Sequence, residues 1–239
     1  ILIYLKFYEK KNITKIVKSK KFHQRGLYEV LTAACFFTGL ILLPVAEVYT
    51  LLMTNPFFVT IFAFIFLKEK VGIRRWSAVI IGFIGVIFVI NPQNIDFNYL
   101  FIFPIIAAIF LTIRDIATKG IATKSNSFEI IFITSILMTL FSGIGSLFFD
   151  FTFKIEYITN LLVSSLFLTI AYVFSVLTIF YAPLSLTASS RYSVIIFGML
   201  FGYLILNEIP SSNMLIGATI ISLSGLFVIN REKKLGKIK

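Results

Sequence analysis

A single arginine stands well inside a long apolar run of this sequence and is the first candidate for chemistry. Arg191 lies in the run 184–206, roughly 11 Å from one end if the run is a helix rising 1.5 Å per residue. A charge at that depth needs a partner, water or a ligand. Either its guanidinium holds a carboxylate or phosphate of a ligand, or it forms an ion pair with Glu29 or Asp115 or snorkels to water. The residues beside it supply hydroxyl groups: Tyr192, Ser189 and Ser190.

Other charged residues lie near the ends of apolar runs. Glu47 is either a protonatable coupling site or a carboxylate that favours a helix N-terminus. Arg114 and Asp115 are either gating residues or solvated charges at a helix end. As neighbours in sequence they do not share a helix face, so we do not expect them to pair with each other. Glu69 and Glu208 occupy matching helix ends, where they either latch alternate gates or accept hydrogen bonds from the following loop.

Uncharged polar residues form a second group of candidates. Asn55 and Pro56 interrupt an apolar run, where they either free backbone carbonyls for a ligand or only kink a helix. Further candidates for lining a binding site are Thr54, Tyr172 and Ser175.

Catalytic and metal chemistry find little support. The chain has one His and one Cys, which excludes a His/Cys metal cluster and an internal disulfide, and it contains no HExxH motif. No P-loop is present, so ATP does not drive a process from within this chain. We therefore expect no catalytic residue, no metal and no cofactor.

Composition identifies the class of protein that must position these residues. Apolar residues make up 58% of the chain and charged residues only 14%, and the mean hydropathy is +0.96. A water-soluble globule needs more polar surface than this. The sequence therefore predicts an all-α integral membrane protein.

Apolar runs of about twenty residues mark helices that can cross about 30 Å of hydrocarbon. On this measure we predict eight transmembrane helices, at residues 26–46, 49–67, 76–90, 99–118, 127–149, 159–181, 184–206 and 214–229.

Basic residues fix the expected orientation of these helices. With eight spans, all basic residues except Lys154 and Arg191 fall on one side of the membrane, which predicts that this side, with the C-terminus, is cytoplasmic. The net charge of +11 is spread over islands between the apolar runs, which argues against a nucleic-acid-binding surface.

The second half of the sequence repeats the first. When Glu69 is placed on Glu208, Phe88-Val89-Ile90-Asn91 falls on Phe227-Val228-Ile229-Asn230 without a gap. The three matching spans of each half run in opposite directions, so the sequence predicts an inverted-repeat helical bundle, as in many secondary transporters. The domains expected are a first repeat at 1–91, a second at 97–230 and a basic tail at 231–239. The first repeat lacks counterparts of roughly forty residues, so we expect ten helices (5+5), of which the first and most of the second are missing from this sequence.

These repeats resemble the EamA-type transporters of the drug/metabolite transporter superfamily. The resemblance lies in NPFFVTIFAFIFLKEKVGIRRWSAVIIGFIGVIFVINP and ASSRYSVIIFGMLFGYLILNEIPSSNMLIGATIISLSGLFVINRE. It includes Pro56, Glu69 and Gly82 or Gly85, with Ile195 standing where a second proline would map. The resemblance implies a small-molecule carrier that works by alternating access, in the bacterial cytoplasmic (inner) membrane.

Two classes of function remain in competition. The first is a secondary transporter of a small metabolite. The sequence FFVT…FLKEKVGIRRW is similar to that of family members that carry S-adenosylmethionine or amino acids. The alternative is a channel or a structural membrane protein. The partners expected are a small-molecule substrate and the lipid bilayer, without nucleic acid; coupling to protons or a counter-substrate and a homodimer remain open.

Overall fold

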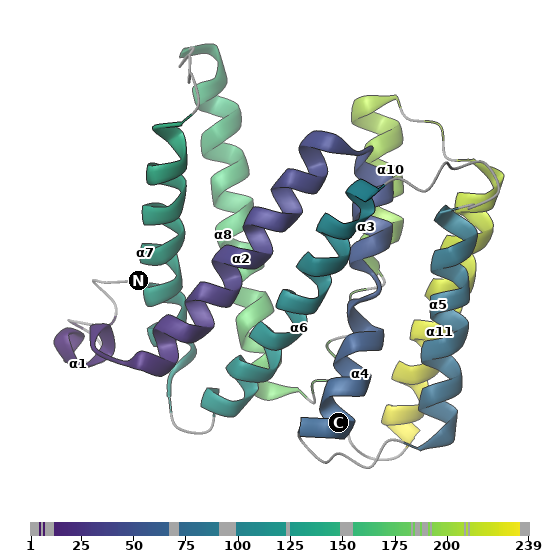
Figure 1. The fold of residues 1–239 in the computed structure, drawn as a ribbon, viewed down its shortest axis with the longest axis horizontal. Helices are drawn as coiled ribbons and strands as arrows, with labels where there is room; N and C mark the ends of the chain where they lie inside the picture. The colour runs from purple at the N-terminus through teal and green to yellow at the C-terminus, as the bar shows by residue number, and fades with distance from the viewer. Residues whose placement is uncertain are drawn as a thin grey trace. The chain divides into compact units, whose positions relative to one another are not determined.

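The computed structural model describes residues 5, 7, 12–66, 72–90, 99–122, 125–148, 155–182, 184, 187, 191, 193–207, 209 and 211–234. Every regular element in these residues is a helix (Figure 1). The elements are α1 (Ile13–Val17), α2 (Lys20–Leu42), α3 (Val45–Leu52), α4 (Asn55–Phe66), α5 (Ile73–Ile90), η3 (Tyr99–Phe101), α6 (Ile102–Ala122), α7 (Ser127–Ser146), η4 (Ile155–Tyr157), α8 (Ile158–Tyr181), α10 (Ser193–Leu206) and α11 (Ser212–Lys234).

The helices carry the predicted membrane character. Within the described residues, five helical stretches are long and apolar enough to cross a membrane: Lys20–Leu42, Glu47–Phe66, Tyr99–Ala122, Ser127–Ser146 and Ile155–Tyr181. Large apolar side chains along α8 stay exposed, for example Phe167 at 67% and Leu168 at 69%. Such a surface is stable against lipid and not against water. The predicted all-α, multi-pass membrane architecture is confirmed.

Helix boundaries differ from the expected ones at the prolines. The predicted run 26–46 ends as α2 at Leu42, two residues before Pro44, which then stands at the N-cap of α3. The predicted span 49–67 is two helices, because a turn at residues 53–54 separates α3 from α4. Pro56 has no N–H to donate to the carbonyl of Leu52, so a continuous helix would lose a hydrogen bond there. Of the predicted span 184–206, the structure describes a helix over Ser193–Leu206, which is α10.

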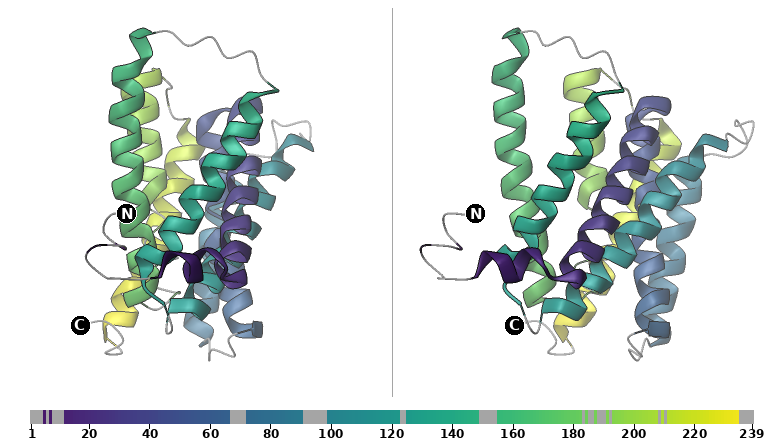
Figure 2. Two further views of the ribbon diagram at one scale, coloured as in Figure 1. Left: turned by 90° about the vertical axis from the view of Figure 1, so that its left-hand side faces the viewer. Right: turned by 60° about the vertical axis from the view of Figure 1, so that its left-hand side comes forward.

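The chain divides into two compact units, whose boundaries fall within α2, within α6 and directly after α8. Unit 1 comprises Ile1–Val30 and Ala117–Tyr181. In it, α7 packs against α8 and α1 packs against α7 (Figure 2). Asn126 begins α7, because its side-chain oxygen accepts a hydrogen bond from Phe128 N at 3.2 Å. The apolar core of unit 1 contains Leu5, Ile16, Phe22, Ile121, Ile130, Phe132 and Ile133.

Unit 2 comprises Leu31–Ile116 and Ala182–Lys239. Its most extensive contact is between α5 and α11, which lie side by side in Figure 1, and α3 packs against α10. A Cβ on Gly85 would stand 3.0 Å from the carbonyl oxygen of Gly217, so the α5 and α11 backbones approach closely at these two glycines. The absence of side chains at both positions permits this close packing. The core beneath this contact contains Met53, Val86, Ala218 and Ile221.

Candidate functional site

A buried ion pair joins Arg191 to Asp115 within unit 2. Nη1 of Arg191 donates to Oδ2 of Asp115 at 2.5 Å. Asp115 lies on α6 and is 1% exposed, whereas the Arg191 side chain is 17% exposed. The sequence offered Glu29 or Asp115 as the ion-pair partner of Arg191, and in the structure the partner is Asp115. Glu29 belongs to unit 1. The sequence predicted Arg191 inside the span 184–206. In the structure it lies in a turn just before α10, where its carbonyl oxygen accepts a hydrogen bond from Val194 N.

Arg114 also pairs with Asp115, which corrects two expectations. Its Nε and Nη2 donate to Oδ1 of Asp115 at 3.0 and 2.7 Å. The two Cβ atoms do point to different faces of α6, but the arginine side chain is long enough to bring its guanidinium back to the neighbouring carboxylate. Arg114 is 6% exposed, and α6 continues beyond it to Ala122, so neither residue is a solvated charge at a helix end.

Asn55 links the same cluster to the start of α4. Its Oδ1 accepts from Nη1 of Arg191 at 2.9 Å, and its Nδ2 donates to Oγ1 of Thr112 at 2.8 Å and to the Ala108 carbonyl at 3.3 Å. Asn55 is completely buried, so these contacts satisfy an amide that would otherwise be costly in the interior. The preceding Thr54 is buried as well and donates to the Leu51 carbonyl, which closes the turn between α3 and α4. The helix break therefore positions Asn55 for Arg191.

One edge of the Arg191 guanidinium remains open. Both hydrogens of Nη1 are directed at Asp115 and Asn55, whereas Nε and Nη2 have no partner among the described residues. The three charged groups of this cluster, Arg191, Arg114 and Asp115, comprise two cations and one anion. The arrangement thus presents a fixed, partly exposed pair of N–H donors with the fork geometry that suits a carboxylate or phosphate.

Tyr172 belongs to a different cluster, inside unit 1. Its hydroxyl donates to Oε2 of Glu29 at 3.0 Å and accepts from Nη1 of Arg25 at 2.7 Å. Arg25 directly precedes the predicted span 26–46, among the basic residues expected on one side of the membrane, yet it is completely buried. The i, i+4 spacing of Arg25 and Glu29 at the start of an apolar run is the signal that could have identified this pair. Ser175 is half-buried one turn beyond Tyr172 on α8.

The remaining predicted residues are placed as follows. Glu47 lies half-buried in the first turn of α3, where its carboxylate interacts favourably with the helix N-terminus. Five candidates lie outside the described residues: Ser189, Ser190, Tyr192, Glu69 and Glu208. Within the described residues, no three His, Cys, Asp or Glu side chains are placed to hold a metal ion.

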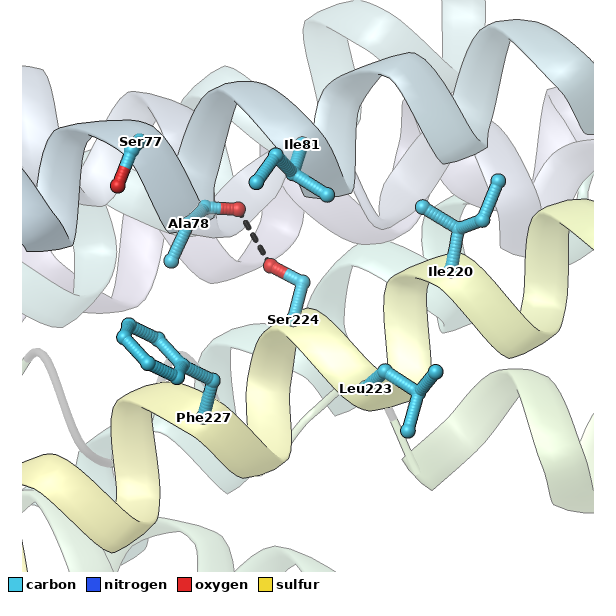
Figure 3. Close-up of a pocket in the computed structure, with 7 residues that line it drawn as sticks. All are labelled: Ser77, Ala78, Ile81, Ile220, Leu223, Ser224 and Phe227. Atoms are coloured by element: carbon cyan, nitrogen blue, oxygen red, sulfur yellow. Dashed lines mark hydrogen bonds between the residues drawn. The ribbon is translucent and has the colours of Figure 1, made fainter.

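Grooves between neighbouring helices of unit 2 are apolar. One, with a volume of about 340 Å³, lies between α5 and α11 (Figure 3). There, the Ser224 hydroxyl donates to the Ala78 carbonyl oxygen of the facing helix, so the polar groups at this crossing satisfy each other. Others lie between α3 and α10 and between α10 and α11, with volumes of about 360 and 530 Å³. Neither Arg191 nor Asp115 lines any of these three grooves, whose walls suit lipid chains better than a polar ligand.

Comparison with known proteins agrees with the membrane architecture. Residues 1–91 match the EamA-like transporter family. A crystal structure of another protein, 14% identical in sequence, superposes with a TM-score of 0.71 over 92% of this chain and 80% of the other, which shows a shared fold.

Relatives with transporter names align over most of the chain. An S-adenosylmethionine uptake transporter of Rickettsia felis is 27% identical over 98% of this chain and 80% of the relative. A riboflavin transporter of Vibrio cholerae is 27% identical over 80% of this chain and 64% of the relative. A pseudopaline exporter of Pseudomonas aeruginosa is 22% identical over 88% of this chain and 74% of the relative. The resemblance to EamA-type transporters seen in the sequence is thereby confirmed for residues 1–91, in a chain that is a multi-pass membrane protein and is similar over most of its length to proteins named as transporters.

Proposed function

We propose that this protein is a carrier of a small, carboxylate-bearing metabolite, and that Arg191 binds the carboxylate. The proposal rests on one observation: the Arg191 guanidinium is held through Nη1 alone, and its Nε and Nη2 are available to a ligand. Asp115 and Asn55 hold Nη1 in place, so Nε and Nη2 keep a fixed direction without a described partner. A donor pair that is oriented in advance costs little entropy when it binds a planar oxyanion.

S-adenosylmethionine fits this chemistry better than riboflavin does. S-adenosylmethionine carries an amino-acid carboxylate that can take both donors of Arg191, whereas riboflavin has neither a carboxylate nor a phosphate. Relatives of this chain bear both names. The substrate class proposed is therefore S-adenosylmethionine or a similar amino-acid-like metabolite, and riboflavin is the second candidate.

Transport by alternating access follows from the inverted repeat expected from the sequence. In this proposal, the segments 1–91 and 97–230 are two related bundles that rock against each other, and 231–239 is a cytoplasmic tail. Glu47, Glu69 and Glu208 are proposed as coupling or gating residues, and Thr54 with Ser189, Ser190 and Tyr192 as neighbours of the bound substrate. The protein is proposed to reside in a bacterial inner membrane, to act as a transporter and not as an enzyme, and to use protons or a counter-substrate.

Uptake by proteoliposomes tests the proposal. The full chain is reconstituted, and entry of radiolabelled S-adenosylmethionine is measured with and without unlabelled S-adenosylmethionine inside. A carrier shows faster entry with internal substrate, whereas a channel shows no such stimulation. Riboflavin uptake under the same conditions decides between the two substrate candidates.

Two variants assign the role of Arg191. Arg191→Ala is expected to abolish uptake while membrane insertion survives, and Arg191→Lys to weaken it strongly because an ammonium lacks the planar donor pair. Arg74→Ala, which removes an exposed arginine of α5, is the matched control and is expected to transport at the unmutated rate. Uptake by Arg191→Ala at the unmutated rate would show that Arg191 is not a binding residue.

A further inference from the structure

Arg25 is completely buried and yet leaves one of its nitrogens without a partner. The residue lies on α2 within unit 1, and it is 0% exposed. Its Nε donates to Oγ1 of Thr118 on α6 at 3.0 Å. Its Nη2 is buried too and has no hydrogen-bond partner in the part of the chain that the structure describes.

The partners of this guanidinium crowd onto its other terminal nitrogen. Nη1 lies 2.8 Å from Oγ1 of Thr134, 2.7 Å from the Tyr172 hydroxyl and 2.8 Å from Oε2 of Glu29. Nη1 has only two hydrogens for these three oxygens, whereas both hydrogens of Nη2 are unused. A purely structural ion pair would place the carboxylate across both nitrogens, as arginine–carboxylate pairs commonly do. In the observed geometry the carboxylate contacts Nη1 alone, so both hydrogens of Nη2 are available to another acceptor.

An unsatisfied donor at this depth is unfavourable, so an acceptor is expected to occupy the site in the working protein. We propose that Nη2 of Arg25 binds an oxygen of an oxyanion, a carboxylate or a phosphate. This makes Arg25 the centre of an anion-binding site in unit 1, separate from the Arg191 site of unit 2. The proposal does not depend on what the Arg191 site carries.

Charge favours an anion over water at this position. Exposed lysines on α1, the turn that follows it and the first turn of α2 precede Arg25 in the same unit: Lys15, Lys18, Lys20 and Lys21. Their combined positive potential attracts anions. Among the described groups that contact Arg25, Thr118 is 0% exposed and Thr134 is 1%, whereas the Glu29 side chain is 13% exposed and Tyr172 is half-buried. Glu29 and Tyr172 are therefore the members of this cluster that lie nearest to solvent.

The test measures anion binding by the full chain in nanodiscs of zwitterionic phosphatidylcholine. Sodium phosphate and sodium acetate are titrated against a sodium chloride control of equal ionic strength, and the thermal unfolding midpoint is followed. We expect a saturable rise of the midpoint with phosphate or acetate. Arg25→Lys, which keeps the charge but loses the second nitrogen, is expected to abolish the rise, and Arg191→Lys is expected to retain it.

Glu29→Gln keeps the proposal testable if Arg25→Lys fails to fold. This substitution removes the one carboxylate described at Arg25, so it is expected to tighten anion binding by about an order of magnitude. Nanodiscs that contain phosphatidylglycerol identify the source of the anion. If a lipid phosphate fills the site, this lipid raises the midpoint and abolishes the response to added phosphate; if a free anion fills it, the response remains.

Two outcomes overturn the proposal. One is the absence of any saturable response to phosphate, acetate or phosphatidylglycerol in both the unmutated chain and Glu29→Gln, which would leave only water at Nη2. The other is an unchanged response in a folded Arg25→Lys variant. Because Arg191→Lys is measured alongside, failure of the Arg25 site is distinguishable from failure of the proposed transport function.

Discussion

Nη1 of Arg191 and Oδ2 of Asp115 lie 2.5 Å apart, and the two residues are separated by 76 positions in the chain. This contact ties the turn before α10 to the middle of α6, both in unit 2. The same carboxylate accepts from Arg114 through its other oxygen. Asp115 is therefore the single described anion that holds two guanidinium groups, and its loss has consequences for stability as well as for binding.

Asp115→Asn is expected to destabilise the protein by about 3 kcal/mol, because it removes the negative charge that the buried Arg114 and the partly buried Arg191 share. The measurement is thermal unfolding in detergent, with uptake measured in parallel. Glu156→Gln, which changes an exposed carboxylate of η4, serves as the control and is expected to leave the unfolding midpoint unchanged. An Asp115→Asn protein as stable as the unmutated one would contradict the role of Asp115 as the shared counter-ion.

Asn55→Ala is expected to weaken both stability and uptake. The substitution removes the acceptor for Arg191 and the donor to Thr112, which corresponds to about 1–3 kcal/mol for buried partners left unsatisfied. The substrate concentration for half-maximal uptake is expected to rise, because the Arg191 guanidinium loses one of its two restraints. Thr60→Val on the same helix is the control: it removes only a local bond to the Pro56 carbonyl. Equal effects of the two substitutions would show that Asn55 does not position Arg191.

The sequence predicted the all-helical membrane architecture, because apolar runs are a local signal, and it included Asp115 among the alternatives for Arg191. The sequence indicated an interruption or a kink at Asn55 and Pro56 but not the division of the span 49–67 into two helices, although Pro56 lacks the N–H that a continuous helix requires. The Arg114–Asp115 contact was not predicted correctly: helix periodicity places Cβ atoms, whereas the reach of an arginine side chain decides where its guanidinium ends.

Burial of Arg25 was missed for a different reason. In the sequence it follows a run of lysines and stands at the edge of an apolar stretch, which is typical of a solvated charge. Its environment is made by Thr118, Thr134 and Tyr172, which lie 93, 109 and 147 positions away in the chain. Only the packing of α6, α7 and α8 around α2 brings these hydroxyl groups together.

Gly85→Ala is expected to destabilise unit 2 by about 1–3 kcal/mol through overpacking. The added Cβ would stand 2.8 Å from Cγ1 of Ile221 and 3.0 Å from the carbonyl oxygen of Gly217, and a backbone carbonyl cannot rotate away as a side chain can. Gly143→Ala on α7 is the matched control, because a Cβ there meets nothing within 4 Å and alanine favours the helix. Thermal unfolding compares the two, and a stabilised Gly85→Ala variant would contradict the close α5–α11 contact.

Labelling with a membrane-impermeant maleimide tests the proposed orientation. The single native cysteine, Cys35, is first replaced by alanine, and one new cysteine is then introduced at Lys18, Leu147 or Lys234, all of which are exposed. The distribution of basic residues places Lys18 and Lys234 in the cytoplasm and Leu147, in the turn after α7, on the opposite side. In intact cells we therefore expect Leu147→Cys to react, and Lys18→Cys and Lys234→Cys to react only after lysis. If Lys18→Cys and Lys234→Cys react from different sides, an odd number of spans separates them. The two halves would then not run in opposite directions, and the inverted repeat on which alternating access depends would have to be abandoned.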